Sequence, residues 1–317
     1  MDYVVKPGDV LRRAALIAAP CCACLFFLGF PLKSTAAEQV RYIASLNTSR
    51  SACMVRVNNF PMFDNFDYQS GSISTGFNLT AFVENGNNDI EVLMGSIDPA
   101  DSTTLYPDSK CTLRITRDTL TSSSPVTEII LSVNDHGKIV SSLSSNANDP
   151  TKEAPLDETQ FPADREDKLF RTGRLVKLDG LPEWEWVKAT PVTEQSLPLI
   201  KDTYTTLWAA MKARDIETMK SMAALSSAEM GESEGMSADL LFKSYELDTK
   251  LADPELSPID LKLDKYQLVT YANGRVFRLA RGIYQNSPLR LKDAEGKAVF
   301  AYNPYFAIVN GKVTLVR

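Results

Sequence analysis

The spacing of apolar residues changes once along this chain, and the change limits the folds that the chain can adopt. Between about residues 50 and 143, apolar and polar residues alternate in short runs such as CMVRVNN, CTLRITRD and VTEIILSV. Clusters of Asn, Gly, Asp and Pro separate these runs, as in antiparallel sheets. From Leu197 the apolar spacing becomes three and four, which is typical of amphipathic helices. The chain is therefore expected to begin as an all-β unit and to continue with helices.

The second half is predicted to place its helices before its strands. One stripe of the first helix is formed by Ile200, Tyr204, Leu207, Trp208 and Met211. Asp215 has the side chain of an N-cap for a second helix, and Ser237 opens a third apolar run. After Pro258, alternating runs from KYQLVTY to KVTLVR predict a meander of strands joined by turns such as Asn-Gly. This order is typical of an α+β fold with helices on one face of an antiparallel sheet.

A polar segment lies between the two halves. Residues 144–167 are acidic, contain prolines and lack apolar periodicity, so we interpret them as an interdomain linker. A chain of 317 residues is long enough for two domains. The predicted order is a signal peptide at 1–37, an antiparallel β-sandwich at 38–143, the linker at 144–167 and an α+β domain at 168–317.

The N-terminus has the organisation of a secretory signal. Arg12 and Arg13 precede the apolar run AALIAAPCCACLFFLGFPL, and the small residues of KSTAAEQ follow it. We place the cleavage after Ala37 or Ala36, which predicts a periplasmic or secreted protein. The alternative is an uncleaved membrane anchor, because the apolar run approaches the length that spans a bilayer.

The chain that would remain after cleavage is acidic and poor in cysteine. Four of the 34 basic residues and two of the 40 acidic residues lie in residues 1–37, so the remainder carries a net charge of −8. It has no basic cluster interleaved with aromatic residues, which argues against nucleic acid as a partner. Cys53 and Cys111 are its cysteines, and in an oxidising compartment we expect them to form one disulfide that joins two strands. Two buried free thiols are the alternative.

Two stretches of the first half resemble a known fold. VRVNNFP and FNLTAFVENGNNDIEVLMG are similar to the galactose-binding-type jelly rolls that accompany many exported glycosidases, with Asn59 where glycine is usual. The resemblance implies a β-sandwich and marks a fold more than a binding site. In FVENGNN we expect a hairpin turn at 84–89, followed by a strand with Ile90, Val92 and Met94 on one face.

About residues 190–317 resemble the cystatin-like, NTF2-like domains. The likeness rests on the helix ending in MKARDIETM, the second helix from Asp215 and the later strands with Asn-Gly turns. It implies a cone between a curved sheet and helices that binds small molecules, catalyses or mediates contacts. Enzymes of this class line the cone with a His–Asp pair, and this half contains no histidine. In general build, an exported acidic two-domain chain also resembles periplasmic immunity proteins that neutralise effectors of rival bacteria.

Hydrolytic chemistry finds little support in the residues. GESEG at 231–235 matches the nucleophile-elbow spacing, but no strand precedes Ser233 and no histidine follows it, so we expect a flexible interhelical loop. His136, the chain's one histidine, lies in VNDHGK, which has the composition of a tight turn. Without further histidines a zinc site is not expected.

Two other stretches are candidate binding sites. The oxygen-rich loops DNFD and DPADS supply weak candidates for calcium, namely Asp64, Asp67, Asp98 and Asp101, with solvated acidic loops as the simpler interpretation. PEWEW places Glu183 and Glu185 beside Trp184 and Trp186. Strand alternation would put the two glutamates on one face and the two tryptophans on the other. This segment is a candidate sugar or partner patch, whereas the simpler interpretation buries both rings.

Together these features predict an exported, non-enzymatic protein that binds another protein. The most concrete form is immunity to a periplasm-acting effector, since an acidic surface attracts a basic partner. One alternative is a carbohydrate- or cell-wall-binding accessory protein. The other is a small-ligand or catalytic cone in the second half, lined by Tyr204, Trp208, Tyr271 and Tyr302. No cofactor is expected, membrane contact is expected only through an uncleaved N-terminus, and the oligomeric state stays open.

Overall fold

The computed structural model describes residues 39–142, 144–146, 149–154, 164–166 and 168–317. The signal peptide expected at 1–37, with its cleavage site, lies outside these residues, and so do parts of the expected linker. Within the described part, no helix is both long enough and apolar enough to traverse a bilayer. The described residues belong to one compact unit, and the fold and the sites below all lie within it.

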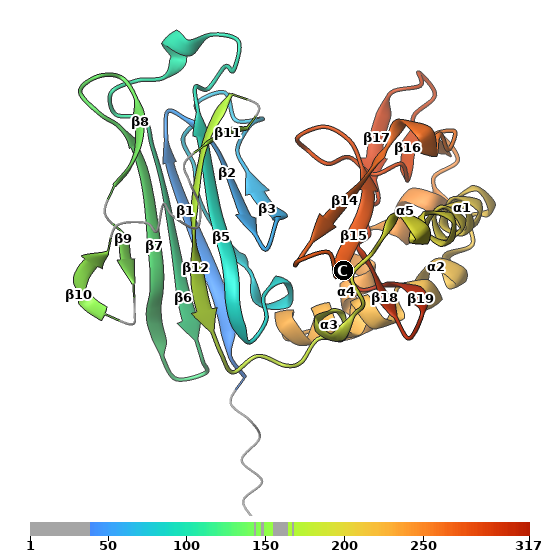
Figure 1. Ribbon diagram of the computed structural model, residues 1–317. Coiled ribbons are helices and arrows are strands. Elements are labelled where there is room, and N and C mark those ends of the chain that lie inside the picture. Colours follow the sequence, from blue (N-terminus) through green and yellow to red (C-terminus); the bar gives the residue numbers. More distant parts are fainter. Residues whose placement is uncertain (1–38, 143, 147–148, 155–163, 167) are drawn as a thin grey trace, which may run out of the picture. The chain divides into compact units, whose positions relative to one another are not determined.

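The N-terminal part consists of two antiparallel sheets (Figure 1). The first has the strand order β10-β9-β7-β6-β1-β4, with β8 also paired to β7, and the second has the order β11-β12-β5-β2-β3. The strands of the first sheet are β1 (Arg41–Ser49), β4 (Ser74–Asn78), β6 (Lys110–Asp118), β7 (Ser123–Val133), β8 (Ile139–Ser142), β9 (Ser144–Asn146) and β10 (Asp149–Ala154). Those of the second are β2 (Ala52–Val57), β3 (Phe60–Asp64), β5 (Gly86–Gly95), β11 (Asp164–Glu166) and β12 (Leu169–Leu178).

Side chains from both sheets form one buried hydrophobic cluster. Leu46 and Leu113 come from the first sheet and Val55 and Val92 from the second, and all four are fully buried. Alternation along each strand directs these residues to a common side. Cys53 at the start of β2 and Cys111 at the start of β6 form a disulfide-compatible pair with Cα atoms 6.2 Å apart. The expected cysteine pair is therefore found in a disulfide-compatible arrangement, and it connects two strands that belong to different sheets.

The FVENGNN stretch is a crossover between the sheets and not the hairpin that its composition predicts. β4 pairs with β1 in the first sheet, and the chain then passes through a short 3-10 helix, η1 (Thr80–Phe82), to β5 in the second sheet. Ile90, Val92 and Met94 do lie fully buried in the shared cluster, as alternation predicts. The turn expected at 84–89 is also wrong, because β5 begins at Gly86 and residues 86–89 pair with β12.

The expected boundary at residue 168 is also corrected. β12 pairs with β5 along its whole length, from Phe170 opposite Met94 to Leu178 opposite Gly86, so residues 169–178 belong to the second sheet. The described residues of the predicted linker include the short strands β9, β10 and β11. A polar, proline-bearing segment therefore leads back into the N-terminal sheets and does not lead out of them.

The C-terminal part combines helices with two further antiparallel sheets (Figure 1). The helices are α1 (Leu197–Ala213), α2 (Ile216–Met222), α3 (Ala224–Glu234), α4 (Ala238–Ser244) and α5 (Leu247–Ala252). One sheet has the order β13-β16-β17 and the other β14-β15-β18-β19. Their strands are β13 (Ser257–Pro258), β14 (Gln267–Tyr271), β15 (Val276–Ala280), β16 (Arg290–Lys292), β17 (Ala298–Ala301), β18 (Phe306–Val309) and β19 (Lys312–Leu315).

The helices bury their apolar stripes against these strands. Tyr204 and Leu207 of α1 join Phe277 of β15 and Phe306 of β18 in a second buried cluster. The predicted N-cap is confirmed, because the side chain of Asp215 accepts a hydrogen bond from Thr218 N at 3.0 Å. Ser237, where a third run was expected to begin, caps α4 in the same way by accepting from Leu240 N at 3.2 Å. The sequence order of helices followed by strands is therefore correct.

Two local predictions in this part are wrong. The segment around Ser233 is not a flexible loop, since it ends helix α3 and Ser233 is buried. The expected meander is also broken, because β15 pairs with β18 and β16 pairs with β17. KAVFAYNPYFAIV divides into β17 and β18 around Asn303 and Pro304, where proline lacks the N–H that a continuous strand would need.

Candidate functional site

The predicted tryptophan patch is buried. Trp184 and Trp186 are 1% and 0% exposed, and they flank and enter a 3-10 helix, η3 (Glu185–Lys188), in place of the expected strand. Trp184 Nε1 donates to the carbonyls of Thr80 and Val83, and Trp186 Nε1 donates to that of Ala81. Both rings therefore serve packing against the crossover before β5.

The two glutamates of PEWEW do not form a carboxylate pair. Glu183 is exposed and lies 2.8 Å from Lys188 Nζ, whereas the backbone N–H of Glu185 donates to Glu229 at 2.7 Å. Tyr204 and Trp208 lie in a different cluster, around α1. Burial raises the pKa of Tyr204, whose hydroxyl accepts from Leu279 N. The structure thus does not bring the six predicted patch residues together.

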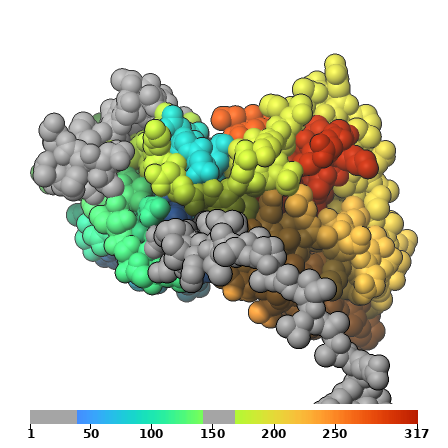
Figure 2. Space-filling model, turned by 90° about the horizontal axis from the view of Figure 1, so that it is seen from below, coloured from blue at the N-terminus to red at the C-terminus, as the bar shows by residue number. Residues whose placement is uncertain are grey.

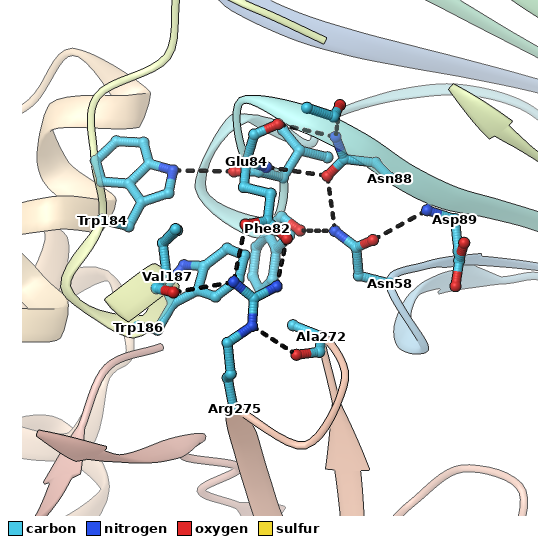
Figure 3. Close-up of polar contacts among 12 residues, drawn as sticks. Asn58, Phe82, Glu84, Asn88, Asp89, Trp184, Trp186, Val187, Ala272 and Arg275 are labelled. Carbon is cyan, nitrogen blue, oxygen red and sulfur yellow. Dashed lines mark hydrogen bonds and ion pairs between the residues drawn. The ribbon is translucent and has the colours of Figure 1, made fainter. Parts of the chain in front are cut away.

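A polar network joins the crossover to the C-terminal strands (Figure 3). The Arg275 guanidinium forms an ion pair with Glu84 and donates to the carbonyl of Val187 at 2.9 Å. Both charged side chains are largely buried, at 17% and 15% exposure. In Figure 2 the yellow-green segment after β12 lies on the displayed face between the cyan crossover and the red C-terminal residues. This network holds the crossover, η3 and the β14–β15 turn together.

The asparagines of the turn stretch extend this network. Asn88 is fully buried, accepts from Glu84 N and Asn58 Nδ2, and donates to the carbonyls of Glu84 and Gly86, all within 3.0 Å. Asn58 completes the connection by accepting from Asp89 N at 3.0 Å. Every polar atom of the Asn88 amide therefore has a partner, and these residues fix the backbone without offering a binding group.

The candidate calcium aspartates have local roles in their loops. Asp98 accepts from Ala100 N at 2.8 Å, and Asp101 accepts from both Thr103 N and its hydroxyl, which lowers the pKa of Asp101. Asp64 accepts from Phe66 N at 3.2 Å, and burial raises the pKa of Asp64. In the part of the chain that the structure describes, no three acidic, histidine or cysteine side chains converge as they would to hold a metal ion.

Asp64, Asp67 and Asp98 lie within two residues in sequence of residues that line an apolar pocket of about 270 Å³. We call it the docking pocket. Its wall includes Ala52, Phe66, Ile97, Leu169, Ile283 and Tyr284. The Phe66 and Tyr284 rings meet edge to face with centroids 5.7 Å apart, and Tyr284 remains 49% exposed. Loops of the N-terminal sheets and the connection between β15 and β16 thus form one concave apolar surface.

Negative charge lies at the edge of the docking pocket. Asp64 and Asp67 flank Phe66 in sequence, and both carboxylates raise the pKa of Tyr284, although its burial contributes more. Asp98 lies between the pocket residues Ile97 and Pro99. One cation is close, because Lys168 donates to the carbonyl of Pro99 at 3.2 Å.

The sequence signalled the acidic loops of this site but not its apolar wall. The oxygen content of DNFD and DPADS indicates solvated acidic loops, with calcium as the weaker alternative, and does not indicate that the loops border an apolar pocket. Ile283 and Tyr284 end an alternating run that predicts a strand, whereas β15 ends at Ala280 and both residues lie in the connection to β16. Their place beside Phe66 follows from the packing of the C-terminal part on β2, β5 and β12, and no local pattern encodes it.

The rejected hydrolytic residues have structural partners. Ser233 Oγ donates to the carbonyl of Met230 at 2.8 Å within α3. His136 is exposed in the turn after β7, where its backbone N–H donates to Asn134 Oδ1 at 3.0 Å.

Comparison with known proteins finds no matching family model, no matching curated protein and no matching solved structure. The proposals below therefore rest on the physical chemistry of this chain.

Proposed function

We propose that this is an exported protein-binding protein whose docking pocket receives an apolar side chain from a basic partner. In this proposal the two N-terminal sheets form a β-sandwich domain and the C-terminal part an α+β, cystatin-like domain. The pocket lies where loops from both parts meet. Its most concrete biological form is immunity, in which the protein neutralises a basic effector that acts in the periplasm.

The observation that carries the proposal is the apolar pocket with Tyr284 exposed at its edge. Filling it with one leucine- or phenylalanine-sized side chain would contribute about 1.5–3 kcal/mol from burial. Exposed tyrosine beside a pocket is typical of the residues that dominate interface energies. Burial of such a ring by a partner also explains why so large an apolar side chain stays at the surface.

Charge favours a basic partner over other occupants. Asp64, Asp67 and Asp98 lie around the apolar wall, and the chain after residue 37 has a net charge of −8. Acidic rims accelerate association with basic proteins, an effect that salt weakens. Export is supported by the disulfide-compatible pair, which suggests an oxidising compartment.

The test measures binding to a displayed peptide library at low and high salt. We expect enrichment of peptides with an aromatic or large aliphatic residue flanked by Lys or Arg, and about tenfold weaker binding by a Tyr284→Glu variant. Leu240→Glu is the matched control, because Leu240 is 56% exposed on α4 and lies outside the pocket. The proposal would be contradicted by enrichment of peptides that lack flanking Lys or Arg. It would also be contradicted by an equal loss of peptide affinity in Tyr284→Glu and Leu240→Glu.

The immunity form has its own test. The protein and the product of a neighbouring gene would be co-expressed in the periplasm, with growth as the readout. We expect the wild type and Leu240→Glu to protect cells and Tyr284→Glu to fail. Protection by all three would place the inhibitory contact elsewhere and leave the peptide result as the measure of the docking pocket.

The carbohydrate alternative loses the observation that motivated it. Trp184 and Trp186 are enclosed, and the guanidiniums of Arg317 and Arg275 lie over their rings at 5.2 and 5.3 Å from the centroids. A Trp184→Ala/Trp186→Ala variant is expected to unfold, since each buried ring contributes about 3–5 kcal/mol. Glycan binding that falls while the fold persists would restore this alternative.

A further inference from the structure

A second pocket, of about 280 Å³, lies between C-terminal elements and the end of η1. Its wall is largely aromatic and includes Phe82, Tyr245, Phe300, Tyr302, Tyr305 and Met230. The other lining residues are Ser226 of α3, Ala301 of β17, Asn303, Pro304 and Arg317. We call it the hydroxyl pocket, and it shares no residue with the docking pocket.

Polar atoms without protein partners lie in this wall. Ser226 is 1% exposed, and among the described residues its buried Oγ has no hydrogen-bond partner. The hydroxyl of Tyr302 also makes no hydrogen bond to the part of the chain that the structure describes, but this oxygen is not fully buried. Tyr245 is half-buried, and Ser226 and Arg317 lie close enough to oppose the rise that burial causes in the pKa of Tyr245.

Such groups are costly unless something satisfies them. Burying a hydroxyl without a hydrogen bond costs on the order of 1–3 kcal/mol, and most buried polar atoms in proteins have partners. Within an aromatic wall, a ligand that carries one hydrogen-bonding group would supply the missing bond and bury its own apolar surface.

Size and charge define the ligand further. An engineered apolar cavity of about 150 Å³ holds benzene, so a pocket of about 280 Å³ has room for a larger aromatic molecule. Arg317 lines the pocket and its positive charge is paired with Glu229, but its buried Nη2 has no hydrogen-bond partner among the described residues and offers one more donor. The pKa values of Tyr245 and Tyr302 are raised, so both hydroxyls stay protonated at neutral pH and can donate as well as accept. No unpaired charge in this wall calls for an ionic ligand.

We infer that the hydroxyl pocket binds a small neutral aromatic molecule with one hydroxyl or similar hydrogen-bonding group. This function is independent of the proposed protein docking. The hydroxyls of Ser226 and Tyr302 recognise the polar group, and the aromatic wall contacts the ring.

The experiment compares 2-naphthol with naphthalene, which differ by one hydroxyl, on the full-length protein. The ¹³C-methyl NMR signal of Met230 reports binding, because Met230 lines the pocket, whereas fully buried Met54 of β2 serves as the internal control. We expect 2-naphthol to shift the Met230 signal in a saturable manner and to bind about tenfold more tightly than naphthalene. No saturable shift, or equal affinity for both probes, would overturn the inference.

Four variants separate recognition from general effects. Ser226→Ala and Tyr302→Phe keep the shape of the wall and should each reduce the preference for 2-naphthol about fivefold. Ala301→Trp should fill the pocket and abolish binding of both probes, whereas Val299→Trp, at a 46% exposed position of the same strand, should change neither. If both hydroxyl variants keep the full preference, the inference is wrong even should Ala301→Trp fail to fold.

Discussion

At the scale of single residues, several side chains in this protein serve the backbone and not a ligand. Asn88 bonds with all of its polar atoms to the crossover around Glu84. Arg214 ends α1 in the left-handed region at φ +57°, which is unfavourable for a side chain of its size. Its guanidinium offsets that cost by donating to the carbonyls of Leu251 in the last turn of α5 and of Asp253 and Leu256 after it.

Asn88→Ala is the first prediction at this scale. Removing the amide leaves buried donors and acceptors of the crossover without partners, so we expect the free energy of unfolding to fall by about 2–4 kcal/mol. Urea denaturation would measure it. Asn87→Ala is the control, because Asn87 is exposed one position away, and it should change stability by less than about 0.5 kcal/mol. Similar losses in the two variants would contradict this role of Asn88.

A second prediction concerns Asp215, the N-cap of α2. The hydroxyl and N–H of Thr218 lower the pKa of Asp215 below its ordinary value of 3.8. Its charged form therefore stabilises the fold above that pH, and the stabilisation is lost as the pH falls through the lower folded pKa. Asp215→Asn keeps a capping oxygen without the charge. Melting temperatures should favour the wild type at pH 6, and the gap should close below pH 3.8, whereas a constant gap would exclude a charge effect.

At the scale of elements, the disulfide-compatible pair ties β2 of one sheet to β6 of the other. Its partners are separated by 58 positions, and closing a loop of that length stabilises a fold by about 4 kcal/mol in the chain-entropy model. Cys53→Ala/Cys111→Ala should lower the urea midpoint accordingly, and reduced wild type should behave in the same way. If the double variant unfolds at the midpoint of the oxidised wild type, the pair does not stabilise the fold.

Apolar periodicity predicts where helices and strands form better than it predicts which strands pair. Ile90, Val92 and Met94 were correctly placed on one buried face, and α1, α2 and α4 begin close to where apolar spacing and caps predict. Apolar periodicity does not predict the pairing of β5 with β12, because 73 residues lie between the two strands and no local rule selects a distant strand. PEWEW alternates like a strand but enters the 3-10 helix η3 at Glu185, because an alternation of five residues is too short to specify a strand.

At the scale of the whole molecule, the ion pair of Arg275 and Glu84 is a contact between the crossover of the N-terminal sheets and the C-terminal strands. Breaking a largely buried pair leaves one charge uncompensated, so we expect Arg275→Ala to cost about 2–4 kcal/mol. Tryptophan fluorescence during denaturation would report it, since Trp186 lies beneath Arg275. Arg114→Ala removes an exposed pair with Glu128 within one sheet and should cost less than about 1 kcal/mol. If the two variants lower the free energy of unfolding equally, the ion pair of Arg275 and Glu84 stabilises the fold no more than an exposed pair does.

The candidate sites also belong to this largest scale. Each of the two pockets used in the proposals takes residues from both parts of the chain, such as Phe66 with Tyr284 and Phe82 with Tyr302. Sequence patterns describe one segment at a time, so they identified the acidic loops and the tyrosines without showing which of them meet. A binding surface made in this way exists only when both parts are folded.

The return of β12 to the second sheet has a consequence for how the chain matures. β5 has β2 as one neighbour early in synthesis, but its other edge stays uncovered until residues 169–178 have been made. Contacts so distant in sequence form slowly, and an uncovered strand edge invites pairing with other chains. Cys53 and Cys111 are both synthesised before residues 169–178, so an early disulfide would hold the two sheets together until β12 pairs with β5.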